Sequence, residues 1–121
     1  MAFKARQVTT IYKICGRALW EAAQAAGQFA GTPVDTRDGF IHFSAAAQVA
    51  ATAAAHFANA TELMLIAVDA DALGQALKWE PSRGGALFPH LYGHLPISAV
   101  VWARPLAEDG AGGHLIPELA P

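Results

Sequence analysis

The chain has 121 residues, a formal net charge of −2 and a pI near 6.2, and its residues are 54% hydrophobic and 15% charged. This apolar composition excludes an intrinsically disordered chain. The slightly acidic balance disfavours nucleic acid as a partner, because nucleic-acid binding depends on clustered basic charge. A chain of this length forms one domain. We expect residues 1–121 to fold as that domain, with a core over about residues 10–106 and a flexible C-terminal tail.

Three further features bear on where the protein works. The N-terminal segment MAFKARQVTT lacks the apolar centre and small-residue cleavage site of a signal peptide. The apolar runs are broken well before the ~20 residues that a membrane-spanning helix needs. Cys15 is the only cysteine, so no disulfide can form within the chain. We therefore expect a cytoplasmic protein without a membrane partner, and the sequence leaves its oligomeric state open.

The N-terminal part of the chain predicts a strand, a helix and a loop. Residues 9–15, TTIYKIC, are rich in β-branched and aromatic side chains, and their alternation places Tyr12 on one face and Lys13 on the other. Residues 16–27 carry the apolar stripe of a helix that ends in glycine. Residues 28–38 contain Gly, Pro and Asp and predict a loop.

The stretch GFIHFS, residues 39–44, predicts a strand whose two faces differ in character. Ile41 points toward the core in this interpretation, while His42 and Ser44 share the other face. Ser44 is also well placed as the N-cap of an alanine-rich helix over residues 44–58.

The second half of the chain predicts two strong strands and a weaker one. Residues 62–69, ELMLIAVD, are apolar on both faces, as in a central strand, and residues 97–106 form the last strand. Residues 78–96 read as irregular. Within them residues 87–92 could form a strand, which Pro89 would restrict to a sheet edge or a bulge.

Between the two strong strands, residues 70–77 predict a short helix capped by Asp69 or Asp71. Strands and helices thus mix without a regular βαβ order, which predicts an α+β fold. We expect a twisted, mostly antiparallel sheet with two alanine-rich helices packed against it.

Polar side chains interrupt several of these apolar segments and are the candidate site residues. They are Lys13 in the first strand, His42 with Ser44 in GFIHFS, His90 with Tyr92 in LFPHLY, and Glu80 beside Trp79 in KWEPS. A cleft for a small organic ligand usually combines apolar walls with a few convergent polar groups. The sequence alone leaves open whether these segments converge.

Each of these residues also has a structural interpretation. A histidine in a strand is more often a hydrogen-bonded core residue than a catalyst. Ser44 can cap the following helix, and Lys13 can leave its ammonium group in water. A metal site is weaker still, because His90 and His94 are four residues apart in a segment whose Gly and Pro disfavour a helix. Phosphate-loop, dinucleotide and nucleophile-elbow motifs are absent from the sequence.

Taken together, these segments resemble a known family. IYKIC, RALWEAAQAAG, DGFIHFS, LKWEPS and LFPHLYGHLP, in this order, resemble the small bacterial domain-of-unknown-function family numbered 952 over residues 10–106. That family implies no established activity. It is distantly similar to the ADP-ribosyltransferase-like folds, which bind NAD or its ADP-ribose part in a cleft of a split antiparallel sheet.

The resemblance implies roles for particular residues. Lys13 matches the early basic position of the ADP-ribosyltransferase-like folds, His42 and Ser44 match their middle motif, and His90 matches the late one. Two departures bear on activity. Lys13 stands where many relatives carry histidine, and no late glutamate aligns with the one that polarises the ribose in many transferring members. Binding without turnover is therefore an open alternative.

We therefore expect a cleft for a nucleotide-type ligand, NAD or an ADP-ribose derivative, with no metal site. The expected ligand contacts come from Lys13, His42, Ser44, Trp79, Phe88 and Tyr92. The candidate catalytic groups are His42, His90 and Glu80. A non-catalytic binding or interaction module is the alternative, and a metal-dependent hydrolase is the third hypothesis.

Overall fold

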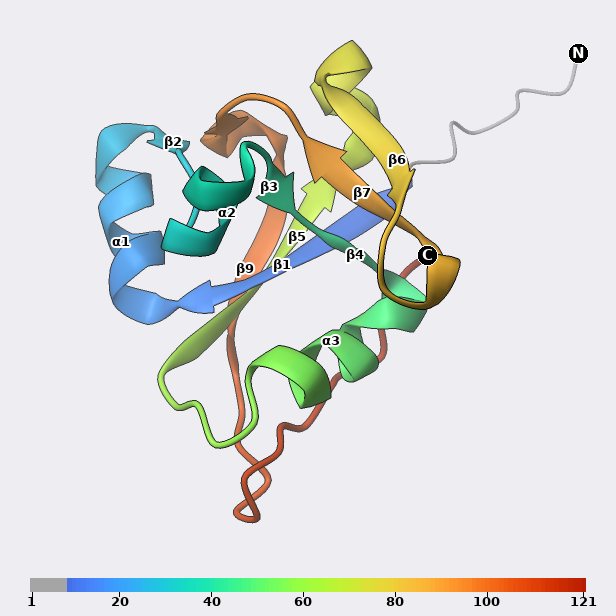
Figure 1. Ribbon diagram of the computed structural model, residues 1–121. Coiled ribbons are helices and arrows are strands. Elements are labelled where there is room, and N and C mark those ends of the chain that lie inside the picture. Colours follow the sequence, from blue (N-terminus) through green and yellow to red (C-terminus); the bar gives the residue numbers. More distant parts are fainter. Residues whose placement is uncertain (1–8) are drawn as a thin grey trace, which may run out of the picture.

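Small antiparallel sheets form the frame of the computed structural model, which describes residues 9–121 (Figure 1). The largest sheet has the strand order β4 (Ser44–Ala45), β1 (Thr10–Gly16), β5 (Leu63–Asp69) and β9 (Val100–Leu106). A second sheet has the order β3 (Ile41–His42), β7 (Leu87–Leu91) and β6 (Leu77–Pro81), and β2 (Gln28–Phe29) pairs with β8 (Leu95–Pro96). Every strand pair within the described range is antiparallel. The predicted α+β class with a mostly antiparallel, split sheet is confirmed.

Three α-helices connect these strands in the described part of the chain. They are α1 (Arg17–Ala26), α2 (Pro33–Asp38) and α3 (Val49–His56), and short 3₁₀ turns cover Ala46–Gln48, Ala70–Ala76, Arg83–Gly85 and Ile97–Ala99. α1 ends as predicted, because Gly27 takes the left-handed conformation at φ 82° and donates its N–H to Ala23 O and Gln24 O. Where a short helix was expected after β5, a 3₁₀ segment forms instead, and the Asp69 carboxylate caps its start by accepting from the N–H of Asp71.

Strands β1 and β5 divide the core into two apolar clusters. Their alternating side chains point to opposite faces, as predicted for both strands. One face packs with α1 in a cluster that includes Ile11, Cys15, Trp20, Phe29, Met64, Ile66 and Val68. The other packs with α3 in a cluster that includes Tyr12, Ile14, Val49, Ala53, Leu63 and Leu65. Figure 1 shows α1 and α3 on different sides of the large sheet.

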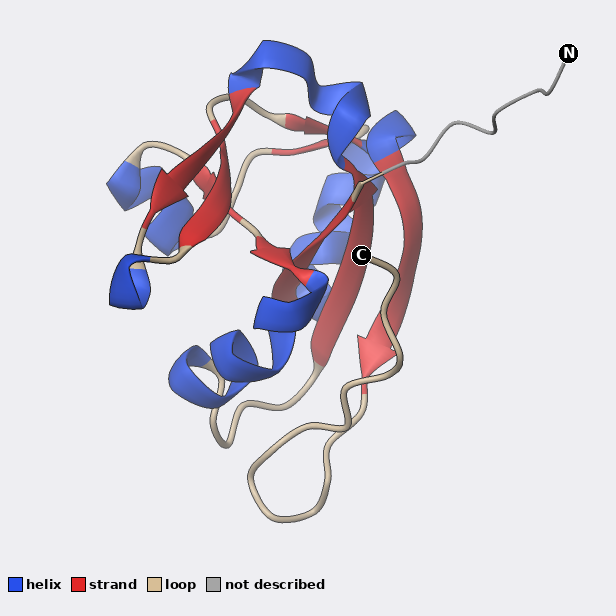
Figure 2. Ribbon diagram, turned by 90° about the vertical axis from the view of Figure 1, so that its right-hand side faces the viewer, coloured by secondary structure: helices blue, strands red, loops and turns tan. Residues whose placement is uncertain are grey.

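The C-terminal segment lies against the large sheet. Ile116 and Leu119 pack on the cluster beneath α3, and the Tyr12 hydroxyl donates a hydrogen bond of 2.7 Å to Ala120 O. Figure 2 shows the chain passing through a wide loop after β9 and then returning along the strands. No helix among residues 9–121 is long and apolar enough to cross a membrane. The expectation that the chain begins without a signal peptide concerns mainly residues 1–8, which lie outside the described structure.

Two predictions about strands are corrected. β6 forms where irregular chain was expected, and β7 is the regular middle strand of its sheet although Pro89 was expected to restrict it to an edge or a bulge. The reason lies in the register, because His42 pairs with His90 and Pro89 therefore lies opposite Phe43, just beyond the end of β3. Pro89 O accepts from the Phe43 N–H there at 3.0 Å, and the missing proline N–H falls where the paired strand has ended.

Two predictions about helices are also corrected. Ser44 is not a helix cap, because it pairs with Tyr12 in the large sheet and its hydroxyl bonds to Thr52 Oγ1 at 2.9 Å. Residues 28–38 were expected to be a loop but contain β2 and α2. A capping box starts α2: the Asp35 N–H donates to the Thr32 hydroxyl, and the Thr32 N–H donates to the Asp35 carboxylate.

Gly31, just before α2, gives the first test of this arrangement. It has φ +108°, and a Cβ there would lie 2.9 Å from the Asp35 Cβ, whereas Gly39, at φ +86°, has no atom within 4 Å of an added Cβ. Both Gly→Ala variants should lose about 1–2 kcal/mol from the left-handed backbone. Gly31→Ala should lose about 1–3 kcal/mol more from the overlap. Equal losses in urea unfolding would contradict this packing.

Candidate functional site

Residues 41–45 pass from the sheet of β3, β7 and β6, called the small sheet below, to the large sheet of β4, β1, β5 and β9. A cleft lies between these two sheets. Ile41 and His42 pair with β7, and Ser44 and Ala45 pair with β1. Because β4 covers β1 only opposite Ile11 and Tyr12, the edge of β1 beyond them borders a cleft of about 450 Å³. The cleft lining also takes in residues of α2, α3 and the two strands of the small sheet that carry His42 and His90.

Five of the predicted site residues line this cleft: Lys13, His42, Ser44, Phe88 and His90. The two imidazole rings are neighbours, with 5.5 Å between their centroids. Residues far apart in the sequence therefore converge, because residues 41–42 pair directly with residues 90–91. This convergence is what the sequence alone left open.

Three predicted residues do not line the cleft. Trp79 is 42% exposed and borders a shallow depression that Thr9 and Asp71 also line, so its expected place in a stacking wall is corrected. Alternation in β6 turns the Trp79 side chain to the opposite face from Glu80. Glu80 and Tyr92 do not line the cleft either. Glu80 bonds to the ring of His90, and Tyr92, just after β7, donates its hydroxyl to Glu80.

The ammonium group of Lys13 is buried and paired. Nζ lies 3.0 Å and 2.9 Å from the two oxygens of Asp35 and donates at 2.9 Å to His42 O. The residue is 6% exposed, so the interpretation that leaves the ammonium in water is wrong. Two of the three N–H donors of the ammonium group make hydrogen bonds, to Asp35 Oδ1 and His42 O, and Asp35 Oδ2 is an ion-pair contact. The charge of Lys13 is therefore committed to Asp35 within the protein.

Asp35 collects partners from three separate segments. Besides Lys13, its carboxylate accepts from the N–H of Thr32 at 2.8 Å and from the N–H and ring Nδ1 of His42 at 3.1 Å and 2.7 Å. Burial alone would raise the pKa of this carboxyl, but the charge of Lys13 and these hydrogen bonds hold the pKa below its usual value. In Lys13 burial has the greater effect and lowers the pKa of the ammonium group, although the charge of Asp35 and its hydrogen bond act to raise that pKa.

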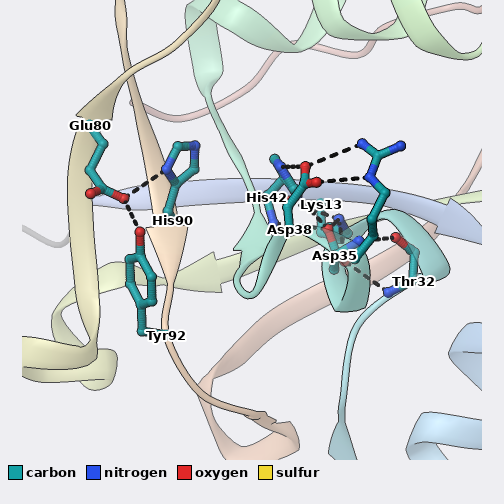
Figure 3. Close-up of polar contacts among 9 residues, drawn as sticks. Lys13, Thr32, Asp35, Asp38, His42, Glu80, His90 and Tyr92 are labelled. Atoms are coloured by element: carbon teal, nitrogen blue, oxygen red, sulfur yellow. Dashed lines mark hydrogen bonds and ion pairs between the residues drawn. The ribbon is translucent and has the colours of Figure 1, made fainter.

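Both ring nitrogens of His42 face carboxylates. Nδ1 is 2.7 Å from Asp35 Oδ1 and Nε2 is 3.1 Å from Asp38 Oδ2, and Asp38 also holds the Arg37 guanidinium at 2.9 Å. Figure 3 shows this chain of contacts running from Lys13 through Asp35 and His42 to Asp38. Both imidazole contacts are hydrogen bonds only when both nitrogens carry protons. His42 thus has no ring nitrogen left for a ligand.

His90 is held differently, by one carboxylate on one side only. Its Nδ1 lies 2.9 Å from Glu80 Oε1, and the Tyr92 hydroxyl donates to the same oxygen at 2.7 Å (Figure 3). The hydrogen bonds from Tyr92 and His90 lower the pKa of Glu80, so this carboxyl is ionised at neutral pH. Phe40 stacks on the imidazole at 4.1 Å and 26°. The ring of His90 is therefore oriented by three neighbours.

The other groups at the cleft are hydroxyls, aromatic walls and a thiol. The Ser44 and Thr52 hydroxyls bond to one another at 2.9 Å, and Phe43 and Phe88 supply apolar wall. Burial raises the pKa of the Cys15 thiol to about 11, so the thiolate that a cysteine nucleophile requires is not the form present at neutral pH.

Within residues 9–121, no three His, Cys, Asp or Glu side chains form a group that could hold a metal ion.

Sequence reasoning missed four residues that shape the site: Asp35, Asp38, Arg37 and Phe40. The first three lie in α2, in the segment expected to be a loop. A signal was present, because Thr32, Pro33 and Asp35 form the start of a capped helix with proline at its first position. Phe40 directly precedes β3, and its stacking on His90 depends on pairing between distant segments.

Replacing only one partner of the buried ion pair between Lys13 and Asp35 should strongly destabilise the fold. Lys13→Met leaves the Asp35 carboxylate buried without its main partner, and we expect a loss of about 3–5 kcal/mol in the free energy of unfolding. Arg17→Met is the matched control, because its bond to Glu62 is equally short at 2.9 Å but exposed, and it should cost about 0–1 kcal/mol. Equal losses for the two variants in urea titrations would refute the structural role of Lys13.

The lowered pKa of Asp35 predicts how stability depends on pH. A carboxyl whose pKa is lower in the folded than in the unfolded state stabilises the fold above the unfolded value, about 3.9, and this contribution disappears as the pH falls through the folded value. The stability difference between wild type and Asp35→Asn should thus be constant near neutral pH and shrink below about pH 4. Glu62→Gln, at an exposed site, should differ little from wild type throughout. A difference for Asp35→Asn that does not change on acidification would contradict the pairing.

A family model described as Protein of unknown function (DUF952) matches residues 14–103. The crystal structure of the protein CC0527 from Caulobacter crescentus is similar with 51% sequence identity and a TM-score of 0.86, over 88% of this chain and 94% of that chain. The solution NMR structure of CC0527 gives 50% identity and a TM-score of 0.75, over 84% and 89%.

No curated protein sequence matches the chain. The family model covers well over half of the chain, and the relative of known structure shares half of its residues over nearly its whole length. The chain therefore belongs to the DUF952 family of proteins of unknown function.

Proposed function

We propose that this protein binds a nucleotide-type small molecule, NAD, ADP-ribose or a related nucleotide, in the cleft between its two larger sheets. The observation that carries the proposal is convergence. β1, β3, β4, β7 and two helices each bring residues to one cleft, and the polar side chains there are held in fixed orientations. The likeness to ADP-ribosyltransferase-like folds is part of this hypothesis and rests on the sequence motifs.

The size and walls of the cleft support a small organic ligand. Ligand pockets usually measure about 300–1,000 Å³ and have largely apolar walls with a few oriented polar groups. This cleft measures about 450 Å³, and Phe43, Phe57 and Phe88 are among its lining residues. A flat base could lie against such a wall, while a sugar would meet the imidazole and the hydroxyl groups.

Arg37, and not Lys13, is the candidate contact for a phosphate group of the ligand. Lys13 is committed to Asp35 and His42 O. Arg37 lines the cleft with its side chain 72% exposed and uses only Nε and Nη2 on Asp38. A guanidinium has five N–H donors in a planar fork that suits phosphate, so donors remain.

A non-catalytic interaction module is the second candidate, and one surface favours it. Trp79 and Leu87 are 42% and 52% exposed, and they lie on the same face of the β6–β7 pair, opposite Pro89 and Pro81 respectively. Exposed aromatic and aliphatic groups on one sheet face can dock a partner. This face is turned away from the imidazole of His90, so the two candidate functions are separable by mutation.

Calorimetric titration tests the cleft. NAD, ADP-ribose and AMP should each be tried against wild type, with inorganic phosphate as the minimal probe. We expect at least one nucleotide to bind, with a loss of about tenfold or more in His90→Ala from the missing hydrogen bond. His94→Ala, an exposed histidine of the same segment, and Trp79→Ala should bind as wild type does.

Two outcomes would go against the proposal. No heat at millimolar concentration with any nucleotide would remove the cleft hypothesis, and loss of binding in Trp79→Ala with none in His90→Ala would move the site to the outer face of the small sheet. A chromatographic assay for released nicotinamide with bound NAD then separates ADP-ribosyl-type chemistry from binding alone.

A further inference from the structure

The two histidines of the cleft differ in what they can offer a ligand. Carboxylates occupy both ring nitrogens of His42. In His90 only Nδ1 has a partner, Glu80, and Nε2 has none among the described residues. The geometry therefore separates the pair into a structural imidazole and an available one.

His90 lines the cleft, and the free nitrogen of its ring is not fully buried in the protein. His90 as a residue is only 5% exposed, so an unpartnered nitrogen could have been entirely buried. Yet Trp20 Nε1 is the only fully buried side-chain N or O atom without a partner in the described part of the chain. His90 Nε2 is thus accessible, and the residue lines the cleft.

Glu80 decides which nitrogen carries the proton in the neutral ring. Its ionised carboxylate is an acceptor only, so the 2.9 Å contact requires Nδ1 to be the donor. The neutral imidazole has one donor and one acceptor nitrogen, and Nε2 is then the acceptor. The Tyr92 hydroxyl on the same Glu80 oxygen and the stacked Phe40 keep carboxylate and ring in place.

We infer that His90 Nε2 is the ligand-reading atom of the cleft and that it accepts a hydrogen bond from a hydroxyl of the ligand, with Glu80 and Tyr92 as positioning residues. The inference rests on the proposed function for the identity of the ligand, a ribose-bearing nucleotide. It selects ligands that present a donor at this point and disfavours analogues in which that hydroxyl is absent. The same lone pair is the one that a general base uses, whereas both ring nitrogens of His42 face carboxylates.

Nitrogen NMR tests the assignment without any ligand. Long-range ¹H–¹⁵N correlation distinguishes protonated from unprotonated ring nitrogens, and His90→Gln assigns the signals. At mildly alkaline pH we expect Nδ1 protonated and Nε2 unprotonated in wild type. Glu80→Ala should lose this preference, and Tyr92→Phe should keep it, with backbone spectra showing that both fold. A proton on Nε2 in the neutral wild-type ring would overturn the inference.

Two nucleotides that differ only in their ribose hydroxyls test the hydrogen bond to His90 Nε2. AMP should bind wild type about tenfold or more tightly than 2′,3′-dideoxy-AMP, because an accessible acceptor loses its donor with the analogue. In His90→Phe, which keeps a flat ring against Phe40, the two should bind equally. Equal binding in wild type, or discrimination that survives in His90→Phe, would overturn the inference. If none of NAD, ADP-ribose and AMP binds, the proposed function fails, and the tautomer measurement still decides the state of His90.

Discussion

A single buried carboxylate holds the site together. Asp35 is 2% exposed and accepts hydrogen bonds from Lys13 of the large sheet, from His42 of the small sheet and from Thr32 before α2. A buried charge is tolerated only with such partners, so these contacts fix where α2 lies relative to both sheets. Gly31 has no side chain because the Asp35 Cβ occupies that space. The hydrogen bonds of Asp35 therefore position α2, whose residues form one wall of the cleft.

The same constraint determines which groups are free for a ligand. Lys13 and His42 are the residues that a motif would suggest first, and both are committed within the protein. Charges that neutralise one another in a buried cluster attract little from solution. What remains is less conspicuous in the sequence: an oriented imidazole nitrogen on His90 and the exposed guanidinium of Arg37. A cleft of this kind suits a ligand that is polar at defined points.

Sequence periodicity predicted the elements better than their partners. Alternation in residues 9–15 and 62–69 was enough to place both faces of β1 and β5, because each face packs into an apolar cluster. It could not show that residues 41–42 pair with residues 90–91, which is a long-range contact. Asp35 was missed for a local reason, since a six-residue helix with a Thr–Pro start resembles a loop in composition. Ser44 has the chemistry of a cap, but strand pairing with Tyr12 takes precedence.

A crystal structure of the protein with ADP-ribose would test the account most directly. Three things should be seen together: the ligand in the cleft, one of its hydroxyls hydrogen-bonded to His90 Nε2, and the contact between Lys13 and Asp35 unbroken. A ligand held by Lys13 after that contact has opened, or seated against Trp79 outside the cleft, would contradict the division between structural and ligand-binding groups described above.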